Sequence, residues 1–243
     1  MFQSYHSRLL IAIVLGVFLD SCEQPKDRNY HYRNTLLDWA QLQYYKESNT
    51  TLETPAPPEN RIVFMGNSIT EGWSQTRPEF FAQKPYINRG IGGQTTPQML
   101  IRFRQDVVDL QPKVVFILAG TNDIAGNTGP TSLKEIADNL KSMCEIAKAN
   151  GIKAVLCSVL AAEDYPWVPG KDPKHKIPAL NSLLKEYAAT NGVYYLDYFT
   201  ALNNGRNGID AFNSYDGVHL TAAGYQVLEP LVESVIEELL GQP

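Results

Sequence analysis

A serine, an aspartate and a histidine in this sequence have the types and the order that nucleophilic catalysis requires. Ser68 follows an apolar run in FMGNSITEGW (64–73), and Asp216 and His219 lie three residues apart in DGVHLT (216–221). A serine hydroxyl becomes a good nucleophile only when a base removes its proton, and His219 can be that base. Asp216 can accept a hydrogen bond from Nδ1 of His219, which leaves Nε2 facing the serine. Taken alone, Ser68 is more typical of a turn or a helix cap than of a nucleophile, and the D-x-x-H pair is more typical of local capping before a helix.

The chain has four histidines, which narrows the choice of base. His6 lies in an N-terminal segment that we expect to be removed, His31 in an expected outer helix, and His175 in the Lys- and Pro-rich stretch GKDPKHK. His219 precedes an expected helix near the end of the fold and has a carboxylate three residues before it. We therefore predict that His219 is the base.

Three groups in polar loops can stabilise an oxyanion. Catalysis of acyl transfer needs preorganised hydrogen-bond donors where negative charge develops. The backbone N–H of Ser68, a backbone N–H at Gly93 in GIGG and the side-chain amide of Asn122 in GTND are suitable donors. For Gly93 a tight turn, and for Asn122 an Asx-turn, are the alternative explanations.

The elements that position these loops form an alternating pattern. Short apolar runs alternate with amphipathic helical patterns, and the runs occupy residues 61–66, 86–93, 113–120, 153–160 and 193–198. Near-continuous apolar strands between helices predict an α/β fold, a three-layer α/β/α sandwich around a parallel sheet of about five strands. Ligands of such sheets bind beyond the carboxyl ends of the strands, where Ser68, Gly93 and Asn122 follow the first three.

Taken together, the polar blocks resemble those of the SGNH (GDSL-type) hydrolases. GNSIT matches the family's serine block, and NRGIGGQTT matches its second block, with the glycine of that block at Gly93. GTND matches the third block, which contains Asn122, and DGVH matches the last block, which contains Asp216 and His219. The resemblance covers about residues 60–240. The resemblance implies a flavodoxin-like fold and a serine esterase. Its catalytic residues would be Ser68, Asp216 and His219, with an oxyanion hole formed by Ser68, Gly93 and Asn122.

One position departs from the family pattern. The serine block usually has Gly-Asp-Ser, and here Asn67 replaces the aspartate. Asparagine keeps a hydrogen-bonding side chain but loses the charge, so we expect Asn67 to brace loops, with a possible substrate contact, and activity to be retained. The G-x-S-x-G elbow of the α/β-hydrolases is a poorer match, because threonine stands where its second glycine would be.

The substrate is less well specified by the sequence. Trp73, one helical turn beyond the serine, and Trp167, in DYPWVPGKDP, can either contact a sugar ring or acyl group or simply pack. The resemblance favours removal of small acyl groups, including O-acetyl groups of carbohydrates. A lysophospholipase or thioesterase, an acyltransferase, and a non-catalytic carbohydrate-binding lipoprotein remain as alternatives.

No cofactor or metal is expected, because the sequence has no H-E-x-x-H, P-loop or dinucleotide fingerprint. The formal net charge of −5 argues against nucleic acid as a partner, and the oligomeric state is left open. Cys144 and Cys157 lack metal or redox spacing, and we expect buried free thiols rather than a disulfide bond.

The N-terminus predicts export. The apolar run LLIAIVLGVFL (9–19) is typical of a signal peptide, and LDSC resembles a bacterial lipobox ending at Cys22. We expect a signal peptide at 1–21, a tether with an N-terminal helix at 22–59, and the hydrolase domain at 60–243. Lipidation of Cys22 would place the protein in the periplasm or on the outer membrane or cell surface of a bacterium, while plain cleavage nearby is the alternative.

Overall fold

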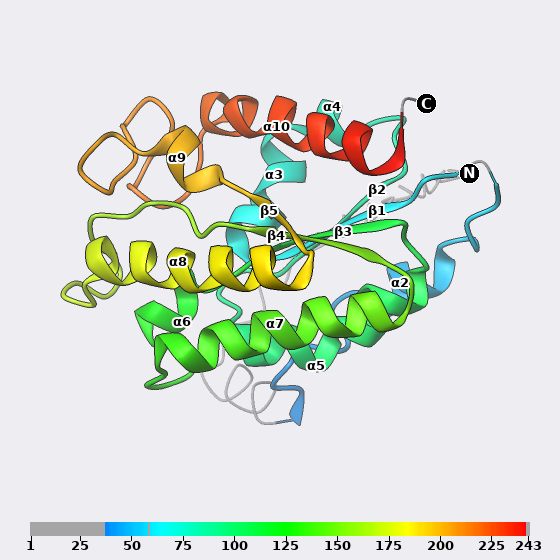
Figure 1. Ribbon diagram of the computed structural model, residues 1–243, viewed down its shortest axis with the longest axis horizontal. Coiled ribbons are helices and arrows are strands. Elements are labelled where there is room, and N and C mark those ends of the chain that lie inside the picture. The colour runs from blue at the N-terminus through cyan, green and yellow to red at the C-terminus, as the bar shows by residue number, and fades with distance from the viewer. Residues whose placement is uncertain (1–36, 58, 242–243) are drawn as a thin grey trace, which may run out of the picture.

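The computed structural model describes residues 37–57 and 59–241, so the expected signal segment (1–21) and Cys22 lie outside the described residues. A five-stranded sheet forms the centre of the molecule, in the order β2-β1-β3-β4-β5 (Figure 1). Every neighbouring pair of strands is parallel. In chain order the strands are β1 (Ile62–Gly66), β2 (Tyr86–Gly90), β3 (Val114–Leu118), β4 (Lys153–Cys157) and β5 (Tyr194–Leu196).

The strands are continuously apolar because helices cover both faces of the sheet. All residues of β1 and of β3 are buried. One face carries α3 (Ser68–Thr76), α4 (Pro78–Phe81) and α10 (Ala222–Leu240), and the other carries α5 (Thr96–Asp106), α7 (Leu133–Ala149) and α8 (Pro173–Asn191) (Figure 1). The predicted three-layer α/β/α fold is therefore confirmed. Short helical segments complete the described chain, namely α2 (Lys46–Thr51), η1 (Val108–Leu110), α6 (Thr121–Ala125) and α9 (Tyr198–Leu202).

The described part of the expected N-terminal helix differs from the prediction. Residues 38–45 form turns, and only α2 is a helix of several residues there. The Asp38 carboxylate accepts the backbone N–H groups of Leu42 and Gln43 at 2.7 and 2.9 Å, and Gln41 has a left-handed φ of 56°. Side-chain capture of backbone donors competes with helix formation, so the aromatic stripe of this segment was misleading. The segment lies against α5 and the loop after β2 and is part of the folded domain.

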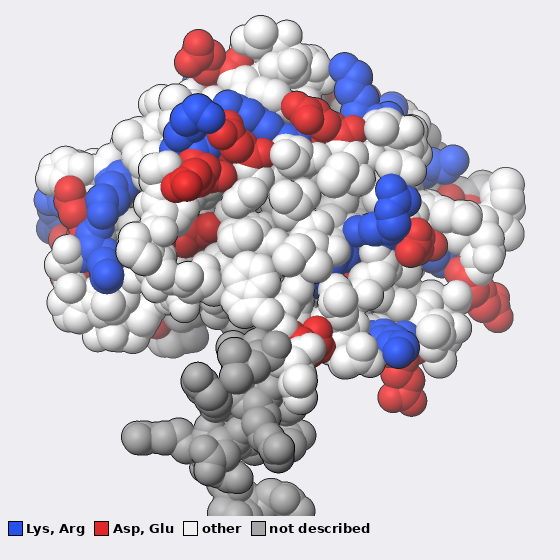
Figure 2. Space-filling view, turned by 90° about the horizontal axis from the view of Figure 1, so that it is seen from below, with Lys and Arg blue, Asp and Glu red and all other residues white. Residues whose placement is uncertain are grey.

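The surface is mixed in charge on the face shown in Figure 2. Lys and Arg side chains lie beside Asp and Glu side chains around a broad uncharged area. Within residues 37–57 and 59–241, no helix combines the length and the apolar character needed to cross a bilayer.

Candidate active site

The candidate nucleophile is placed by the junction between β1 and α3. Ser68 is the first residue of α3, and Asn67 caps that helix by accepting a hydrogen bond from Ile69 N at 3.1 Å. The backbone of this junction packs closely against the first turn of α3, since a Cβ on Gly66 would lie 1.9 Å from Oγ1 of Thr70. Ser68 is partly exposed at the helix N-terminus, and its Oγ lies 2.9 Å from Nε2 of His219.

The segment before α10 holds the histidine and its carboxylate together. Oδ2 of Asp216 lies 2.6 Å from Nδ1 of His219, while Oδ1 accepts the backbone N–H groups of Val218 at 2.9 Å and His219 at 2.7 Å. An ionised carboxylate only accepts hydrogen bonds, which assigns the proton to Nδ1 and leaves Nε2 as an acceptor facing Ser68.

The same contacts set the ionisation of Asp216. Desolvation raises its pKa and is the largest single effect, but the hydrogen bonds from the His219 side chain and from the backbone of His219 and Val218 together outweigh it. The pKa of Asp216 therefore lies below its ordinary value, and the carboxylate stays charged beside His219 at neutral pH.

The glycine loop after β2 lies directly against the nucleophile. A Cβ on Gly92 would lie 3.8 Å from Cβ of Ser68, and Gly93 has a φ of +76° that favours glycine. Gly92 N donates to Oε2 of Glu71 at 2.9 Å. Among the described residues, neither Gly93 N nor Ser68 N has a hydrogen-bond acceptor, so both donors are available to a ligand.

Asn122 lies beside the same loop and is 3% exposed. It belongs to α6, directly after β3, and its Nδ2 donates to the carbonyl oxygen of Gln94 at 3.0 Å. One amide hydrogen is thereby used to hold the loop, and the second stays available. The structure thus brings five residues together at one edge of the sheet: Ser68, Gly93, Asn122, Asp216 and His219. The sequence predicted that they meet at this edge.

Two of the expected substrate contacts are placed in the interior instead. Trp73 is 2% exposed and stacks between the rings of Phe80 and Tyr225, with centroids 5.1 and 5.3 Å away. Asn67 is 1% exposed and serves as the cap of α3. Neither side chain can reach a ligand at the surface, so the expectation of substrate contact was wrong for both, while the bracing role of Asn67 agrees with its cap.

The third expected contact, Trp167, lies at the rim of the site. Its ring is 44% exposed, stacks on Tyr165 and lies 5.8 Å from the ring of His219. Tyr215, which the sequence analysis missed, is 71% exposed and stacks on His219 with ring centroids 5.8 Å apart. The available signal was its position directly before Asp216, in the segment already assigned to the site.

Glu71 was also missed. It lies one turn after Ser68 on α3, and it accepts hydrogen bonds from Gly92 N and from the hydroxyl of Tyr44. The i, i+3 spacing from the serine was the signal, since such residues share a helix face. Glu71 therefore ties the glycine loop to the helix that carries the nucleophile.

The two remaining cysteines lie away from this site. Cys144 and Cys157 are buried free thiols, and burial raises the pKa of each to about 12. Within the described part of the chain, no group of three or more His, Cys, Asp or Glu side chains is arranged to hold a metal ion.

Known proteins are similar to this chain at several levels. A GDSL-like lipase from Bacteroides thetaiotaomicron is 43% identical, with a TM-score of 0.81 over 83% of this chain and 100% of that one. The human platelet-activating factor acetylhydrolase IB subunit alpha2 is 24% identical over 192 residues, 76% of this chain and 80% of its own length. The uncharacterized lipoprotein YqeF of Bacillus subtilis is 37% identical over 92 residues, and this match spans 37% of this chain and only 36% of that lipoprotein.

The sequence model of the GDSL-like lipase/acylhydrolase family matches residues 64–227, a range that begins in β1 and ends in α10. This range contains the serine junction, the glycine loop, Asn122 and the Asp216–His219 pair. The chain therefore belongs to the GDSL-like lipase/acylhydrolase family.

Proposed function

We propose that this protein is a serine ester hydrolase that releases small acyl groups, chiefly O-acetyl groups of carbohydrates, through an acyl-enzyme intermediate. The observation that carries the proposal is the hydrogen-bonded chain from Asp216 through His219 to Ser68, with contacts of 2.6 and 2.9 Å. A serine, an oriented histidine and a carboxylate in this geometry are suited to nucleophilic acyl transfer.

The reaction begins when Oγ of Ser68 attacks the ester carbonyl carbon and Nε2 of His219 takes the hydroxyl proton. The carbonyl electron pair moves to oxygen and then returns, the bond to the alcohol breaks, and His219 gives its proton to the leaving alcohol. Water, deprotonated by His219, then attacks the acyl-serine, and the acid leaves as Ser68 is restored. Asp216 keeps the proton of His219 on Nδ1 throughout and stabilises the imidazolium.

The oxyanion of each tetrahedral intermediate is held by three donors in this proposal. These are the backbone N–H groups of Ser68 and Gly93, which have no acceptor within residues 37–57 and 59–241, and the second amide hydrogen of Asn122. Such donors act strongly because they are fixed before the charge develops.

The aromatic rim supports a carbohydrate as the alcohol part of the ester. His219 protonates the leaving alcohol, so the exposed rings of Trp167 and Tyr215, each 5.8 Å from the His219 ring, lie where that part of the substrate would bind. Flat aromatic faces with a polar edge suit the apolar face of a sugar ring. The name of the human relative, an acetylhydrolase, supports a short acyl group.

The test is a substrate panel of p-nitrophenyl acetate, butyrate and octanoate, acetylated xylo-oligosaccharides and a lysophospholipid. We expect hydrolysis of the acetyl esters and no activity in Ser68→Ala. Trp167→Ala and Tyr215→Ala should raise KM for the acetylated sugar more than for p-nitrophenyl acetate. A preference for octanoate or lysophospholipid would contradict the acetyl assignment. Glycan binding without hydrolysis of any ester would identify a non-catalytic binding protein. Formation of new esters with added alcohols would identify an acyltransferase.

We propose further that the protein is exported and carries lipid on Cys22. The lipobox-like LDSC and the similarity to a lipoprotein over part of the chain support this. The wild-type protein, expressed in a bacterium, should partition into the detergent phase of Triton X-114, and Cys22→Ala should move to the aqueous phase. Aqueous partitioning of the wild type would favour plain cleavage.

A further inference from the structure

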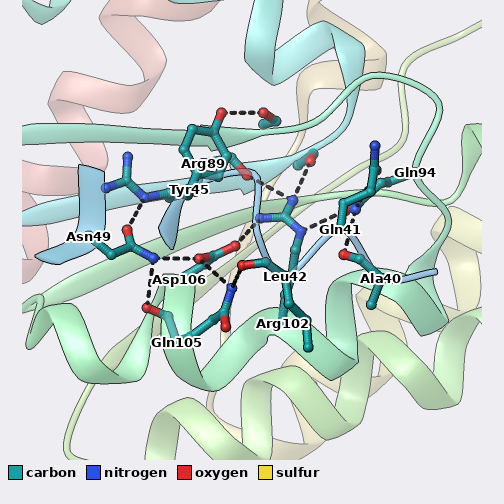
Figure 3. A network of polar contacts seen from close by, with 12 residues as sticks. Ala40, Gln41, Leu42, Tyr45, Asn49, Arg89, Gln94, Arg102, Gln105 and Asp106 are labelled. Carbon is teal, nitrogen blue, oxygen red and sulfur yellow. Dashed lines mark hydrogen bonds and ion pairs between the residues drawn. The ribbon is translucent and has the colours of Figure 1, made fainter. Parts of the chain in front are cut away.

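A buried ion pair on α5 lies behind the catalytic loops and takes no part in the proposed chemistry (Figure 3). Arg102 and Asp106 have fully buried side chains, and Nη1 of Arg102 lies 2.9 Å from Oδ2 of Asp106. Buried ion pairs of this kind contribute little to stability compared with apolar residues of the same size. The contacts of this pair point to another role.

Arg102 joins the two loops that must face each other across the oxyanion. Its Nη2 donates to the carbonyl oxygens of Gly66 at 3.1 Å and Arg89 at 2.9 Å. Gly66 ends β1 two residues before Ser68, and Arg89 lies near the end of β2, four residues before Gly93. One rigid guanidinium group therefore sets the spacing between the nucleophile junction and the start of the glycine loop.

Gln94 connects the same guanidinium to the far end of the glycine loop. Its Oε1 accepts from Nε of Arg102 at 2.6 Å, and its backbone oxygen accepts from Nδ2 of Asn122 at 3.0 Å. The residue directly follows Gly93 and is 1% exposed. The positions of Gly93 and Asn122 thus both depend on where Arg102 holds Gln94.

The N-terminal strap, which we define as residues 40–49, closes the network from outside (Figure 3). Nε2 of Gln94 donates to the Ala40 carbonyl at 3.0 Å and to Oε1 of Gln41 at 2.8 Å. Nδ2 of Asn49 donates to Oδ1 of Asp106 at 2.6 Å. The strap therefore shields the ion pair and supplies polar partners to Gln94.

We propose that Arg102 is a positioning residue that, through Gln94, fixes the oxyanion donors of Gly93 and Asn122 relative to Ser68. This rests on the ester hydrolysis proposed above. Donors displaced by part of an ångström bind the transition state less well but leave ground-state binding little changed. Breaking the contact between Arg102 and Gln94 should therefore lower kcat and leave KM nearly unchanged.

The central variant is Gln94→Met, which is close in size and leaves the Arg102–Asp106 pair intact. With p-nitrophenyl acetate, kcat should fall roughly 10- to 100-fold, the scale of small misplacements in active sites. Gln94→Glu keeps the acceptor for Nε of Arg102 but loses the donor to the Ala40 carbonyl and to Oε1 of Gln41, so it should recover only part of this loss. Arg102→Lys, which loses the guanidinium fork, should reproduce the loss of kcat.

Gln105→Met is the matched control. Nε2 of Gln105 donates to the Leu42 carbonyl at 2.8 Å and to Oδ1 of Asp106 at 3.3 Å, so the variant removes contacts of the strap and of Asp106 but none made by Arg102 or Gln94. Its kcat should equal that of the wild type, even where its melting temperature falls as far as that of Gln94→Met. All activities are compared at temperatures where circular dichroism shows each variant folded.

A double variant separates positioning from general damage. If Gln94 acts through the oxyanion donors, Gln94→Met should reduce kcat less in an Asn122→Ala background, where only the effect through Gly93 remains, whereas independent effects would multiply to within about twofold. Suppose that Ser68→Ala is inactive, as the proposed function requires. Effects of Gln94→Met and Asn122→Ala that multiply, or a folded Gln94→Met with the kcat of the wild type, would then overturn the positioning role. Equal activity of wild type and Ser68→Ala would instead contradict the proposed function, and the positioning role with it.

Discussion

Replacing Asp216 with asparagine should trap His219 in its inactive tautomer. In the wild type, Oδ1 of Asp216 accepts two backbone N–H groups, from Val218 and His219, and Oδ2 accepts Nδ1–H of His219. An asparagine has one oxygen, and the two backbone donors will hold it in the Oδ1 position. Its NH₂ group then faces Nδ1, which must be an acceptor, so the proton moves to Nε2 and points at Ser68.

The size of the effect follows from the cost of reversing this arrangement. To restore the active tautomer the amide must rotate, which leaves the N–H groups of Val218 and His219 without acceptors. Two unsatisfied donors cost roughly 2–6 kcal/mol. Since about 1.4 kcal/mol corresponds to a factor of ten in rate, kcat should fall roughly 30- to 20,000-fold.

The assay is steady-state hydrolysis of p-nitrophenyl acetate near neutral pH, with kcat and KM determined separately. KM should stay close to the wild-type value, because Asp216 makes its hydrogen bonds to the protein and not to the ester. A kcat of Asp216→Asn close to that of the wild type would refute the tautomer reasoning.

The chain contains its own control for this substitution. Asp172 and His175 have the same D-x-x-H spacing, and Oδ1 of Asp172 also lies 2.6 Å from Nδ1 of His175. Both side chains are more than half exposed, and asparagine tolerates the left-handed φ of 58° at position 172. Asp172→Asn should leave kcat unchanged; a loss comparable to that of Asp216→Asn would show that the effect is not specific to the site.

Four further predictions concern the site, the core and the thiols. Asn122→Ala should lower kcat roughly 100- to 1000-fold with p-nitrophenyl acetate, and an unchanged kcat would remove Asn122 from the oxyanion hole. Trp73→Ala should reduce the free energy of unfolding by about 3–5 kcal/mol in urea titrations, because it empties a fully packed aromatic site. Its kcat per folded molecule should stay near the wild-type value, which a substrate-contacting tryptophan would not allow. Because the pKa of Asp216 is depressed in the folded state, its ionisation stabilises the fold above its unfolded pKa of about 3.9, and this contribution is lost as the pH falls through the lower folded pKa. The stability difference between wild type and Asp216→Asn should therefore shrink in acid urea titrations, and a difference that grows would contradict the sign. In a Cys22→Ala protein, Cys144 and Cys157, whose pKa values are raised to about 12, should react with Ellman's reagent only after denaturation, and rapid labelling of the native protein would show that they are accessible.

The sequence was informative wherever burial is imposed on a whole element. The five strands were predictable because a sheet covered on both faces needs uninterrupted apolar runs, as in β1 and β3. The segment at 38–45 was not, since its conformation depends on one carboxylate, Asp38, capturing two backbone N–H groups. For Trp73 the sequence left substrate contact and packing both open, although Ile69, four residues earlier, already indicated a shared buried helix face.

The roles of Arg102 and Gln94 could not be deduced from sequence in the same way. Charged residues at positions 102 and 106 interrupt the buried face of α5 formed by Met99 and Phe103, which signals a special environment but not its partners. Those partners come from β1, β2 and the strap, and they lie up to 36 residues from Arg102 and up to 54 residues from Gln94 in the sequence. Only the packed structure brings them to one guanidinium group.

The two D-x-x-H pairs show where the sequence stops and the tertiary structure begins. Spacing alone determined that Asp172 can hold His175 and that Asp216 can hold His219, because three residues bring a carboxylate within reach of Nδ1, and both contacts measure 2.6 Å. Which histidine meets the serine was decided by the fold. The parallel sheet places the end of β1 beside the segment before α10, and Ser68 meets His219 across 151 residues of sequence, while His175 stays in solvent at the start of α8.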